Sequence, residues 1–361
     1  MKKNKVLFVC PKYDESRISG TSVRPIQMLQ ALKDVYGPEN VVVAVGESND
    51  RRKVYQNLDI DELDLVYMEN STMPLALTDD DHLPRNIFLE YTLFEKCKNK
   101  NVPVFVFYRD VRWRFNFYKI KHKFLKRMIA YTFYFLELAL YKLSDVKLCM
   151  PSCNMADYVP LYSRDTVITL PPGSSCGIPY KHSYKDGEMF RLLYTGGILP
   201  PVYDLTEMLR VLENIENIEL VVVCRAAEWK LVTEANMYKP GANVKIVHES
   251  GAALESRFRH AHAFFDFRGG TEYLNFSMPI KIFESIGAGL PIICKANTAY
   301  GNYVKHNLLG WVFDDSGGLI SGLKEIVASP EKYVKIAENT NLHSKNVTWV
   351  SRIEKLRALV Q

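Results

Sequence analysis

Short apolar runs alternate with amphipathic helical patterns along almost the whole chain of 361 residues. Short runs rich in β-branched residues are typical of buried strands, and helices between them favour parallel sheets covered on both faces. The alternation therefore predicts an α/β fold with two doubly wound, Rossmann-like domains. The expected strands lie at 6–10, 41–45, 65–68, 104–108, 146–150, 167–170, 190–195, 220–224, 244–248, 263–267 and 291–294.

A turn-rich segment separates the two series of strands. Residues 173–189 contain many turn formers and little apolar periodicity, so we interpret them as a linker. We expect domains at 1–172 and 190–344, and each is long enough to bury a core of its own. A terminal helix at about 345–361 is expected to pack back on the first domain, with Trp349 as a packing anchor.

Composition excludes several classes of protein. The net charge of +5 is mild and does not indicate nucleic-acid binding. The seven cysteines form no Cys-x-x-Cys pair, which favours a reducing, cytoplasmic setting. The lysine-rich start precedes an apolar run at 6–10 that is too short for a signal peptide, so we interpret this run as the first strand.

The sequence gives no clear metal site. The run Asp79, Asp80 and Asp81 could be read as metal carboxylates, but its context favours an acidic helix start or a solvated loop. Cys149 and Cys153 lack the spacing of zinc ligands. We expect no metal and no cofactor.

The segment at 266–293 has polar, rigid and small residues spaced as in a ligand site. Pro279 suits the first turn of a helix. Lys281 and Glu284 then share a face near the helix N-terminus, where free N–H groups and the dipole favour an anion. A Gly-x-Gly turn ends the short helix before the next strand. A basic and an acidic side chain therefore flank an expected anion site.

This pattern, Pro-x-Lys-x-x-Glu followed by Gly-x-Gly-x-Pro, resembles the donor-nucleotide loop of the GT-B glycosyltransferases, in the broad group around family four. The resemblance implies that Glu284 holds the ribose hydroxyls and that Lys281 and the helix N-terminus hold the diphosphate of a nucleotide sugar. It implies acceptor binding by the first domain and donor binding by the second, across a cleft. The motif residues are Pro279, Lys281, Glu284, Gly287, Gly289 and Pro291.

One position departs from the commonest pattern of that group. A second glutamate usually stands eight positions before the ribose glutamate, and here that position is Phe276. Either Glu272 or Tyr273 supplies the sugar contact from a shifted loop, or the donor sugar is read differently. Retaining and inverting chemistry both stay open.

The resemblance places further donor contacts after the other strands of the second domain. Tandem glycine permits close backbone approach to a diphosphate, and Arg225 is either a two-pronged phosphate clamp or a surface residue. Relatives cradle the nucleobase after the strand at 244–248. Besides Lys281 and Glu284, the expected donor residues are Gly196, Gly197, Arg225, His248, Ser250, Arg268, Glu272, Tyr273 and Asn275.

Two sites are expected in the first domain. Small residues open a helix after the first strand, as an acceptor or phosphate loop or as a simple helix cap; they are Gly20, Thr21 and Ser22, followed by Arg24. Asp110 lies in an Arg-Asp segment that resembles one found in bacterial surface-polysaccharide transferases. It is the candidate general base or acceptor-positioning residue, and the alternative is that it pairs with Arg109 or Arg112 to order its loop.

Basic and aromatic residues are interleaved after Asp110, which suits the surface of an anionic membrane. The alternative is an ordinary core helix with a basic face, and the apolar stretch that follows is too short to span a bilayer. The expected membrane contacts are Trp113, Phe115, Lys119, Lys123 and Arg127.

Together these patterns predict a metal-independent, hexosyltransferase-like glycosyltransferase. We expect a UDP-sugar rather than a GDP-sugar as donor, and a glycan or lipid-linked glycan as acceptor, in assembly of capsule or another bacterial surface polysaccharide. Such an enzyme would be cytoplasmic and peripheral on the inner membrane face. Alternatives are an epimerase or hydrolase of nucleotide sugars with the same architecture, or a non-catalytic homologue that binds a nucleotide sugar.

Overall fold

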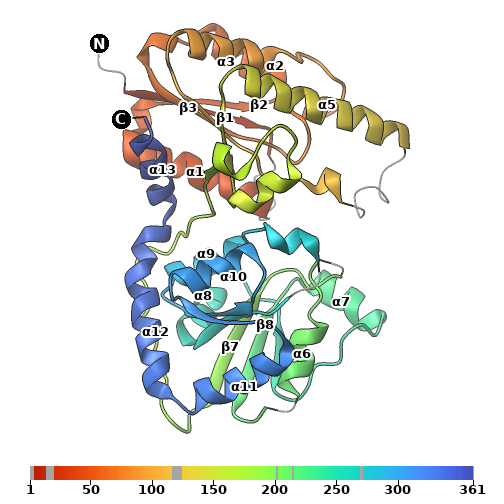
Figure 1. Ribbon diagram of the computed structural model, residues 1–361, viewed down its shortest axis with the longest axis vertical. Coiled ribbons are helices and arrows are strands. Elements are labelled where there is room, and N and C mark those ends of the chain that lie inside the picture. The colour runs from red at the N-terminus through yellow and green to blue at the C-terminus, as the bar shows by residue number, and fades with distance from the viewer. Residues whose placement is uncertain are drawn as a thin grey trace. The chain divides into compact units, whose positions relative to one another are not determined.

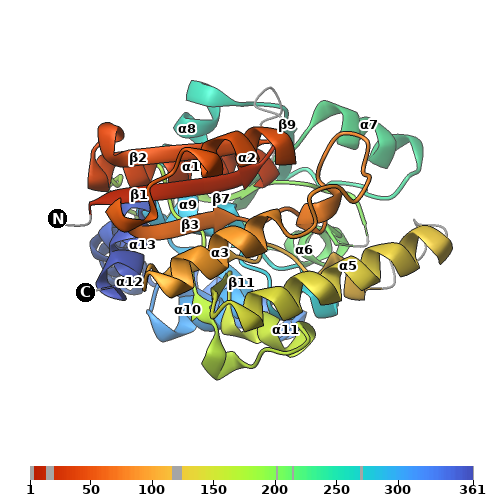
Figure 2. The same cartoon turned by 90° about the horizontal axis from the view of Figure 1, so that it is seen from above.

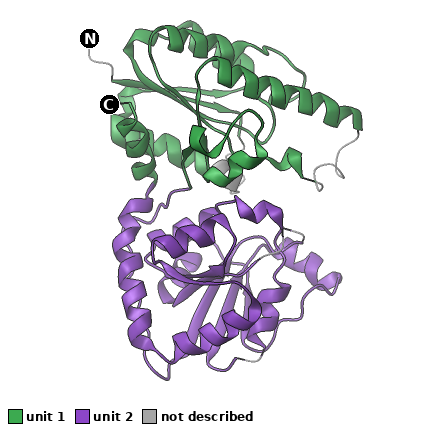
Figure 3. Cartoon of the chain, in the orientation of Figure 1, with its two compact units in different colours: residues 1–171, 349–361 green, residues 172–348 purple. Residues whose placement is uncertain are grey.

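The computed structural model describes residues 4–13, 20–115, 124–200, 202–213, 215–268 and 271–360 (Figure 1). The chain divides into two compact units, coloured separately in Figure 3. Unit 1 comprises residues 1–171 together with 349–361, and unit 2 comprises residues 172–348. Each unit has its own parallel sheet, so each is described by itself.

Unit 1 has a sheet of six parallel strands in its described residues, in the order β2-β1-β3-β4-β5-β6. The strands are β1 (Lys5–Pro11), β2 (Val41–Gly46), β3 (Leu63–Glu69), β4 (Val104–Phe107), β5 (Lys147–Met150) and β6 (Ile168–Thr169). The helices are α1 (Gly20–Tyr36), α2 (Ser48–Gln56), α3 (Leu89–Asn99), α5 (Phe124–Leu143) and α13 (Trp349–Ala358).

The described part of unit 2 also has six parallel strands, in the order β12-β11-β10-β7-β8-β9. The strands are β7 (Phe190–Thr195), β8 (Ile218–Val223), β9 (Val244–Val247), β10 (Ala263–Asp266), β11 (Ile292–Lys295) and β12 (Gly310–Phe313). The helices are α6 (Thr206–Leu212), α7 (Ala226–Glu234), α8 (Gly251–His260), α9 (Ile280–Gly287), α10 (Ala299–His306), α11 (Ser316–Val327) and α12 (Pro330–His343).

The strands of unit 2 bury side chains on both faces of the sheet. Leu192 and Tyr194 of β7 pack into one apolar cluster, and Leu193 between them packs into another. This is the alternation that a strand covered by helices on both sides requires. The predicted α/β class with two doubly wound sheets is confirmed. Strand β12 was not predicted.

Helix α13 belongs to unit 1 although it is the last helix of the described chain. Its residues Trp349, Ile353 and Leu356 are buried in the same cluster as Val6 and Phe8 of β1. The residues just before it stay in unit 2, where the N–H of Ser174 donates to Val347 O at 2.7 Å. Unit 1 is therefore built from two separate stretches of the chain.

Helices α3 and α5 of unit 1 lie side by side (Figure 2). The ring of Phe94 on α3 lies 6.0 Å from that of Tyr141 on α5. Helix α5 is the longest apolar helix of the unit, yet none of the helices in the described residues has the length and hydropathy needed to cross a membrane.

Candidate functional site

The strand order of unit 2 marks one position, at the carboxyl ends of its central strands, where a ligand is expected to bind. From β7 the chain moves outward through β8 and β9, and it then returns to place β10 on the other side of β7. In open α/β sheets, ligands bind at the carboxyl ends of the strands where the order reverses in this way. Gly196 and Gly197 follow β7 and Arg268 follows β10, so the topology brings these predicted residues to the reversal point.

Arg268 is buried at this point and is paired with Asp266, the last residue of β10. Its Nε donates to Asp266 Oδ1 at 2.7 Å and its Nη2 donates to Oδ2. The guanidinium also lies 5.6 Å from the ring centroid of Tyr194 and 5.1 Å from that of Tyr203. Burial alone lowers the pKa of Arg268, and the attraction of Asp266 outweighs it, so the pKa is raised well above the usual value.

The glycine turn after β7 is held by tyrosines. The hydroxyl of Tyr194 donates to Gly197 O at 2.6 Å. A Cβ atom added to Gly197 would lie only 3.1 Å from the ring of Tyr203. Gly196 has a φ of +154°, which side chains rarely adopt. Both glycines are therefore needed for this turn as it is packed here.

Lys281 and Glu284 lie together on α9. The helix begins at Ile280, directly after Pro279, and ends at Gly287, as the sequence pattern predicted. Lys281 Nζ donates to Glu284 Oε2 at 2.7 Å, and both side chains are partly exposed. Helix α9 connects β10 to β11, so its N-terminus follows the carboxyl end of β10. A basic group, an acidic group and the free N–H groups of a helix are thus in reach of one ligand.

Arg225, His248 and Ser250 lie at the neighbouring strand ends. Arg225 is the N-cap of α7, and its Nη1 donates to Glu228 Oε1 at 2.9 Å. His248 Nδ1 lies 2.9 Å from the carbonyl oxygen of Cys224, which can only accept, so Nδ1 donates in this contact. Ser250 is the exposed N-cap of α8.

The loop before α9 contains both exposed polar residues and a buried aromatic residue. Glu272, Tyr273 and Asn275 lie on a 3-10 turn (Glu272–Asn275), with Glu272 and Asn275 exposed. Phe276 is buried, and its ring lies 5.0 Å from that of Tyr273. The residue at the position of the usual second glutamate is therefore a core residue, while Glu272 and Asn275 are accessible to a ligand.

The corresponding reversal in unit 1 lies between β1 and β3 and carries a buried charge cluster. Arg24 Nε donates to Glu69 Oε1 at 2.9 Å, and Arg109 Nη2 lies 3.4 Å from Glu69 Oε2. Arg24 also lies 3.3 Å from the centroid of the Phe107 ring. Arg24 is therefore an interior residue that is held by Glu69. Gly20, Thr21 and Ser22 form the first turn of α1, and their side chains lie outside the description.

Asp110 follows β4 and is engaged with Arg112. Its Oδ1 accepts from the N–H of Arg112 at 3.0 Å, and its Oδ2 lies 3.0 Å from Arg112 Nε. Of the two pairings that the sequence allowed, the one with Arg112 is present. Arg109 pairs with Glu69, as described above.

The expected membrane contact at Trp113 is wrong. This residue is 2% exposed, its ring stacks 4.8 Å from that of Tyr134, and its Nε1 donates to Tyr108 Oη at 3.1 Å. The indole lies in the interior because Tyr131 and Tyr134 of α5 and Tyr108, which follows β4, surround it. Phe115 is partly buried beside Tyr158. Lys119 and Lys123 lie outside the described residues.

The exposed apolar residues of this region lie on α5 instead. Phe124 and Leu125 are 69% and 71% exposed, and Met128 and Ile129 one turn later are also exposed. Arg127 lies among them, with its guanidinium 5.4 Å from the Phe124 ring. From the sequence, this stretch was predicted to be apolar and aromatic, but its exposed and buried faces could not be told apart.

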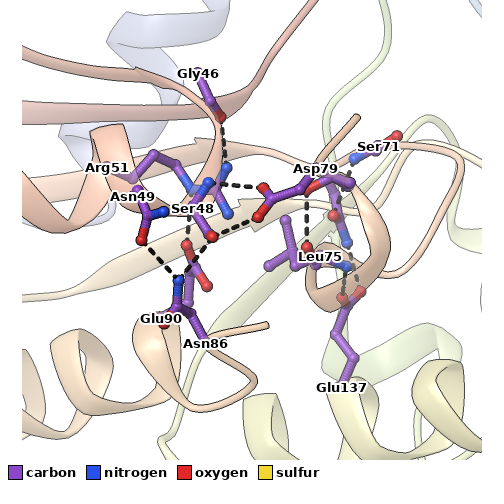
Figure 4. A network of polar contacts seen from close by, with 12 residues as sticks. Gly46, Ser48, Asn49, Arg51, Ser71, Leu75, Asp79, Asn86, Glu90 and Glu137 are labelled. Carbon is purple, nitrogen blue, oxygen red and sulfur yellow. Dashed lines mark hydrogen bonds and ion pairs between the residues drawn. The ribbon is translucent and has the colours of Figure 1, made fainter. Parts of the chain in front are cut away.

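The first residue of the acidic run Asp79, Asp80 and Asp81 has a structural role. The interpretation of the run as an acidic helix start or a solvated loop is therefore wrong for Asp79. Asp79 is buried, and its carboxylate accepts from the N–H and the Oγ of Ser48, at 2.7 and 2.6 Å, at the first residue of α2 (Figure 4). It therefore caps a helix that is distant in sequence. Within the described residues, no group of three or more histidine, cysteine, aspartate or glutamate side chains could hold a metal ion.

No protein-family model matches the sequence, and no curated protein sequence matches it. Solved structures match the fold over the whole chain. Sucrose-phosphate synthase from Thermosynechococcus elongatus has a TM-score of 0.64 at 13% identity, with 98% of each chain covered. HepE from Anabaena, in complex with UDP-glucose, has a TM-score of 0.59 at 12% identity, also with 98% of each chain covered. WaaG, a glycosyltransferase involved in lipopolysaccharide biosynthesis, has a TM-score of 0.56 at 16% identity, with 99% of each covered.

These matches define the class of fold. The chain has the two-domain GT-B fold of these glycosyltransferases, and the predicted fold is confirmed.

Proposed function

We propose that the chain is a glycosyltransferase that moves a sugar from a UDP-sugar to a glycan or lipid-linked glycan acceptor. One observation carries the proposal: Lys281 and Glu284 lie together at the start of α9, which follows the reversal point of the unit 2 sheet. The shared fold supports it, because HepE of the same fold binds UDP-glucose. Donor binding by unit 2 and acceptor binding by unit 1 are part of the proposal.

In this proposal Glu284 accepts hydrogen bonds from the ribose hydroxyls. Lys281, Arg225 and the N–H groups of α9 face the diphosphate, where they stabilise the negative charge that develops as the sugar leaves. His248 and Ser250 lie beside the base, and Glu272, Tyr273 and Asn275 lie beside the donor sugar. No step requires a metal ion. Asp110 is the candidate base or acceptor-positioning group in unit 1.

Binding of nucleotides tests the donor site. A ligand that binds only the folded protein raises its apparent stability, so UDP, GDP, dTDP and CDP can be compared by thermal shift and calorimetry. We expect saturable binding of UDP that is weakened by Glu284→Ala and by Lys281→Ala. Glu338→Ala, at an exposed glutamate of α12, is the control and should bind as the wild type does. Failure of all four nucleotides to bind would contradict the proposal.

We propose further that the protein contacts an anionic membrane surface through the first turns of α5. Phe124, Leu125, Met128 and Ile129 expose apolar area next to Lys126 and Arg127, and this combination suits the interface of an anionic bilayer. A lipid-linked acceptor in surface-polysaccharide assembly would be presented at such a surface, on the inner face of the cytoplasmic membrane.

Vesicle sedimentation tests the membrane proposal. Phe124→Ser with Leu125→Ser should reduce binding to vesicles that contain phosphatidylglycerol, while Leu342→Ser is the control. Leu342 is 70% exposed on α12 of unit 2, so it matches Leu125 in exposure but lies far from α5 in sequence. Equal vesicle binding by the wild type and the double variant would contradict a role of α5.

A second function has one observation in its favour. Because Asp110 is bonded twice to Arg112, the chain could bind a nucleotide sugar without transferring it. The two functions differ in one assay: a transferase consumes UDP-sugar only with an acceptor and loses activity in Asp110→Ala, whereas a binding protein consumes none. An epimerase or hydrolase would convert the donor alone.

A further inference from the structure

Glu228 connects two loops at the proposed donor site. Its Oε1 accepts from Arg225 Nη1 at 2.9 Å, and its Oε2 accepts from the backbone N–H of Ile198 at 3.0 Å. Arg225 follows β8, and Ile198 belongs to the turn that follows β7. One carboxylate thus joins the ends of two neighbouring parallel strands.

The position of Glu228 makes this use unusual. Arg225 is the N-cap of α7, so Glu228 is the third residue of the helix. In a capping box, a glutamate at this position folds back to the backbone N–H of a serine or threonine N-cap residue. Here the N-cap is Arg225, and the Glu228 carboxylate accepts from its guanidinium and from the N–H of Ile198 in another loop. The Glu228 side chain therefore binds the neighbouring turn and does not form a capping box at its own helix.

The turn that Glu228 reaches is the glycine turn after β7. Tyr194 Oη holds the carbonyl of Gly197 at 2.6 Å, and Glu228 holds the N–H of the next residue, Ile198. The peptide group between Gly197 and Ile198 is therefore bonded at both its oxygen and its nitrogen. A peptide fixed in this way keeps one orientation, so the backbone of Gly196 and Gly197 is ordered before any ligand arrives.

Glu228 also restrains the arginine beside this turn. The Arg225 side chain is 67% exposed and that of Glu228 only 14%, so the guanidinium has one donor on Glu228 and most of its area towards solvent. A guanidinium has five N–H donors. Arg225 can therefore stay bonded to Glu228 and donate to a phosphate as well.

Building on the donor site proposed above, we propose that Glu228 is a positioning residue for the donor diphosphate. It orders the glycine turn through Ile198 and aligns Arg225 through the ion pair, and Arg225 in turn cancels the repulsion between the Glu228 carboxylate and the diphosphate. Glu228 itself does not contact the donor. No sequence motif marks it, because a glutamate in the first turn of a helix is common.

Binding of UDP to four variants tests this role. We expect Glu228→Ala to weaken UDP binding about tenfold, as for the loss of hydrogen bonds to a charged group. Glu228→Gln should stay within about threefold of the wild type, because its amide oxygen can still accept from Ile198. In an Arg225→Ala background, Glu228→Ala should weaken binding less than it does alone, since the two residues act together.

A merely structural role would give another result. It would lower the thermal midpoint of Glu228→Ala and leave UDP affinity unchanged at a temperature where the variant is folded, and this outcome overturns the inference. Rescue by Glu228→Gln and non-additivity with Arg225→Ala are readouts that a structural role would not produce. If Glu228→Ala does not fold, equal affinity of the wild type, Glu228→Gln and Arg225→Ala overturns the inference instead.

Failure of this inference and failure of the proposed function are distinguishable. If the wild-type protein binds UDP and Glu228→Ala binds it equally, the donor site stands and only the role of Glu228 is lost. If neither the wild-type protein nor Glu284→Ala binds any of the four nucleotides, the donor site itself is contradicted, and the role of Glu228 falls with it.

Discussion

Arg268 and Asp266 form a two-pronged ion pair inside unit 2, with Nε of Arg268 2.7 Å from Oδ1 of Asp266. Both side chains are almost fully buried, and the pair lies where β10 meets β7 at the reversal of the sheet. A buried pair of this kind is costly to break because the remaining charge has no solvent to compensate it. The pair therefore fixes the backbone from which the loop between β10 and α9 starts.

Asp266→Asn should destabilise the protein by about 3 kcal/mol, because the Arg268 guanidinium would stay buried without a counter-charge. Urea unfolding measures this change. The matched control is Glu325→Gln, which removes one carboxylate from the exposed pair of Glu325 and Lys332 and should leave the midpoint unchanged. Equal midpoints for Asp266→Asn and the wild type would show that the buried pair contributes nothing.

Gly197→Ala should weaken UDP binding about tenfold, because the new methyl group crowds the Tyr203 ring and displaces the turn. Calorimetry with UDP measures the loss. Gly177→Ala is the control, since a Cβ there meets no atom within 4 Å. Adding Tyr203→Ala to Gly197→Ala should recover part of the affinity, and a double variant no better than the single one would rule out the contact with Tyr203 as the cause.

Glu137 makes stability depend on pH. Burial raises its pKa to about 7, and hydrogen bonds from the N–H of Leu75, Asn70 and Tyr141 oppose this rise only in part. Glu90 on α3 adds repulsion. Figure 4 shows Glu137 beside the loop after β3, where the N–H of Leu75 donates to it, and Glu90 beside Arg51 of α2. The folded protein thus holds a proton on Glu137 that the unfolded chain releases near its ordinary pKa of 4.5.

The direction of the pH effect follows from this proton. The stabilising contribution is complete below about pH 4.5, and it is lost as the pH rises through about 7, with a total of about 3 kcal/mol. Glu137→Gln should therefore unfold at a higher urea concentration than the wild type at pH 8, with a smaller difference at pH 5. Parallel pH profiles of the two proteins would contradict the buried proton, and Glu338→Gln is the exposed control.

Trp113→Ala should lower the free energy of unfolding by about 3 to 5 kcal/mol, since it empties the space between Tyr108 and Tyr134. Leu125→Ala, at a residue 71% exposed, should have almost no effect on stability. Urea unfolding of both variants distinguishes the core of this region from its surface. A Trp113→Ala protein as stable as the wild type would restore the possibility of a surface role for the indole.

The sequence was sufficient to predict those helices and strands that are marked by residues within the element or directly beside it. Period and turn residues marked the helix that starts after Pro279, because proline and glycine constrain the backbone at their own positions. Strand β12 escaped prediction because its four residues, beginning with Gly310, are all only partly buried at the edge of the sheet. An edge strand of this length has no apolar periodicity to detect.

Side-chain partners distant in sequence were beyond this kind of prediction. Arg24 meets Glu69 and Asp79 meets Ser48 only once the sheet of unit 1 has formed. Their charges therefore suggested exposed or ligand-binding roles that the contacts do not match. Glu228 was missed for the same reason, since its partner Ile198 lies on another strand end.

The placement of α13 has a consequence for synthesis of the protein on the ribosome. All of unit 2 is synthesised before Trp349, Ile353 and Leu356, whereas unit 1 is begun first and still lacks these residues. A domain generally folds as a unit. The second-made unit can therefore be finished first, and the first-made unit keeps part of its apolar surface uncovered until translation reaches the last helix.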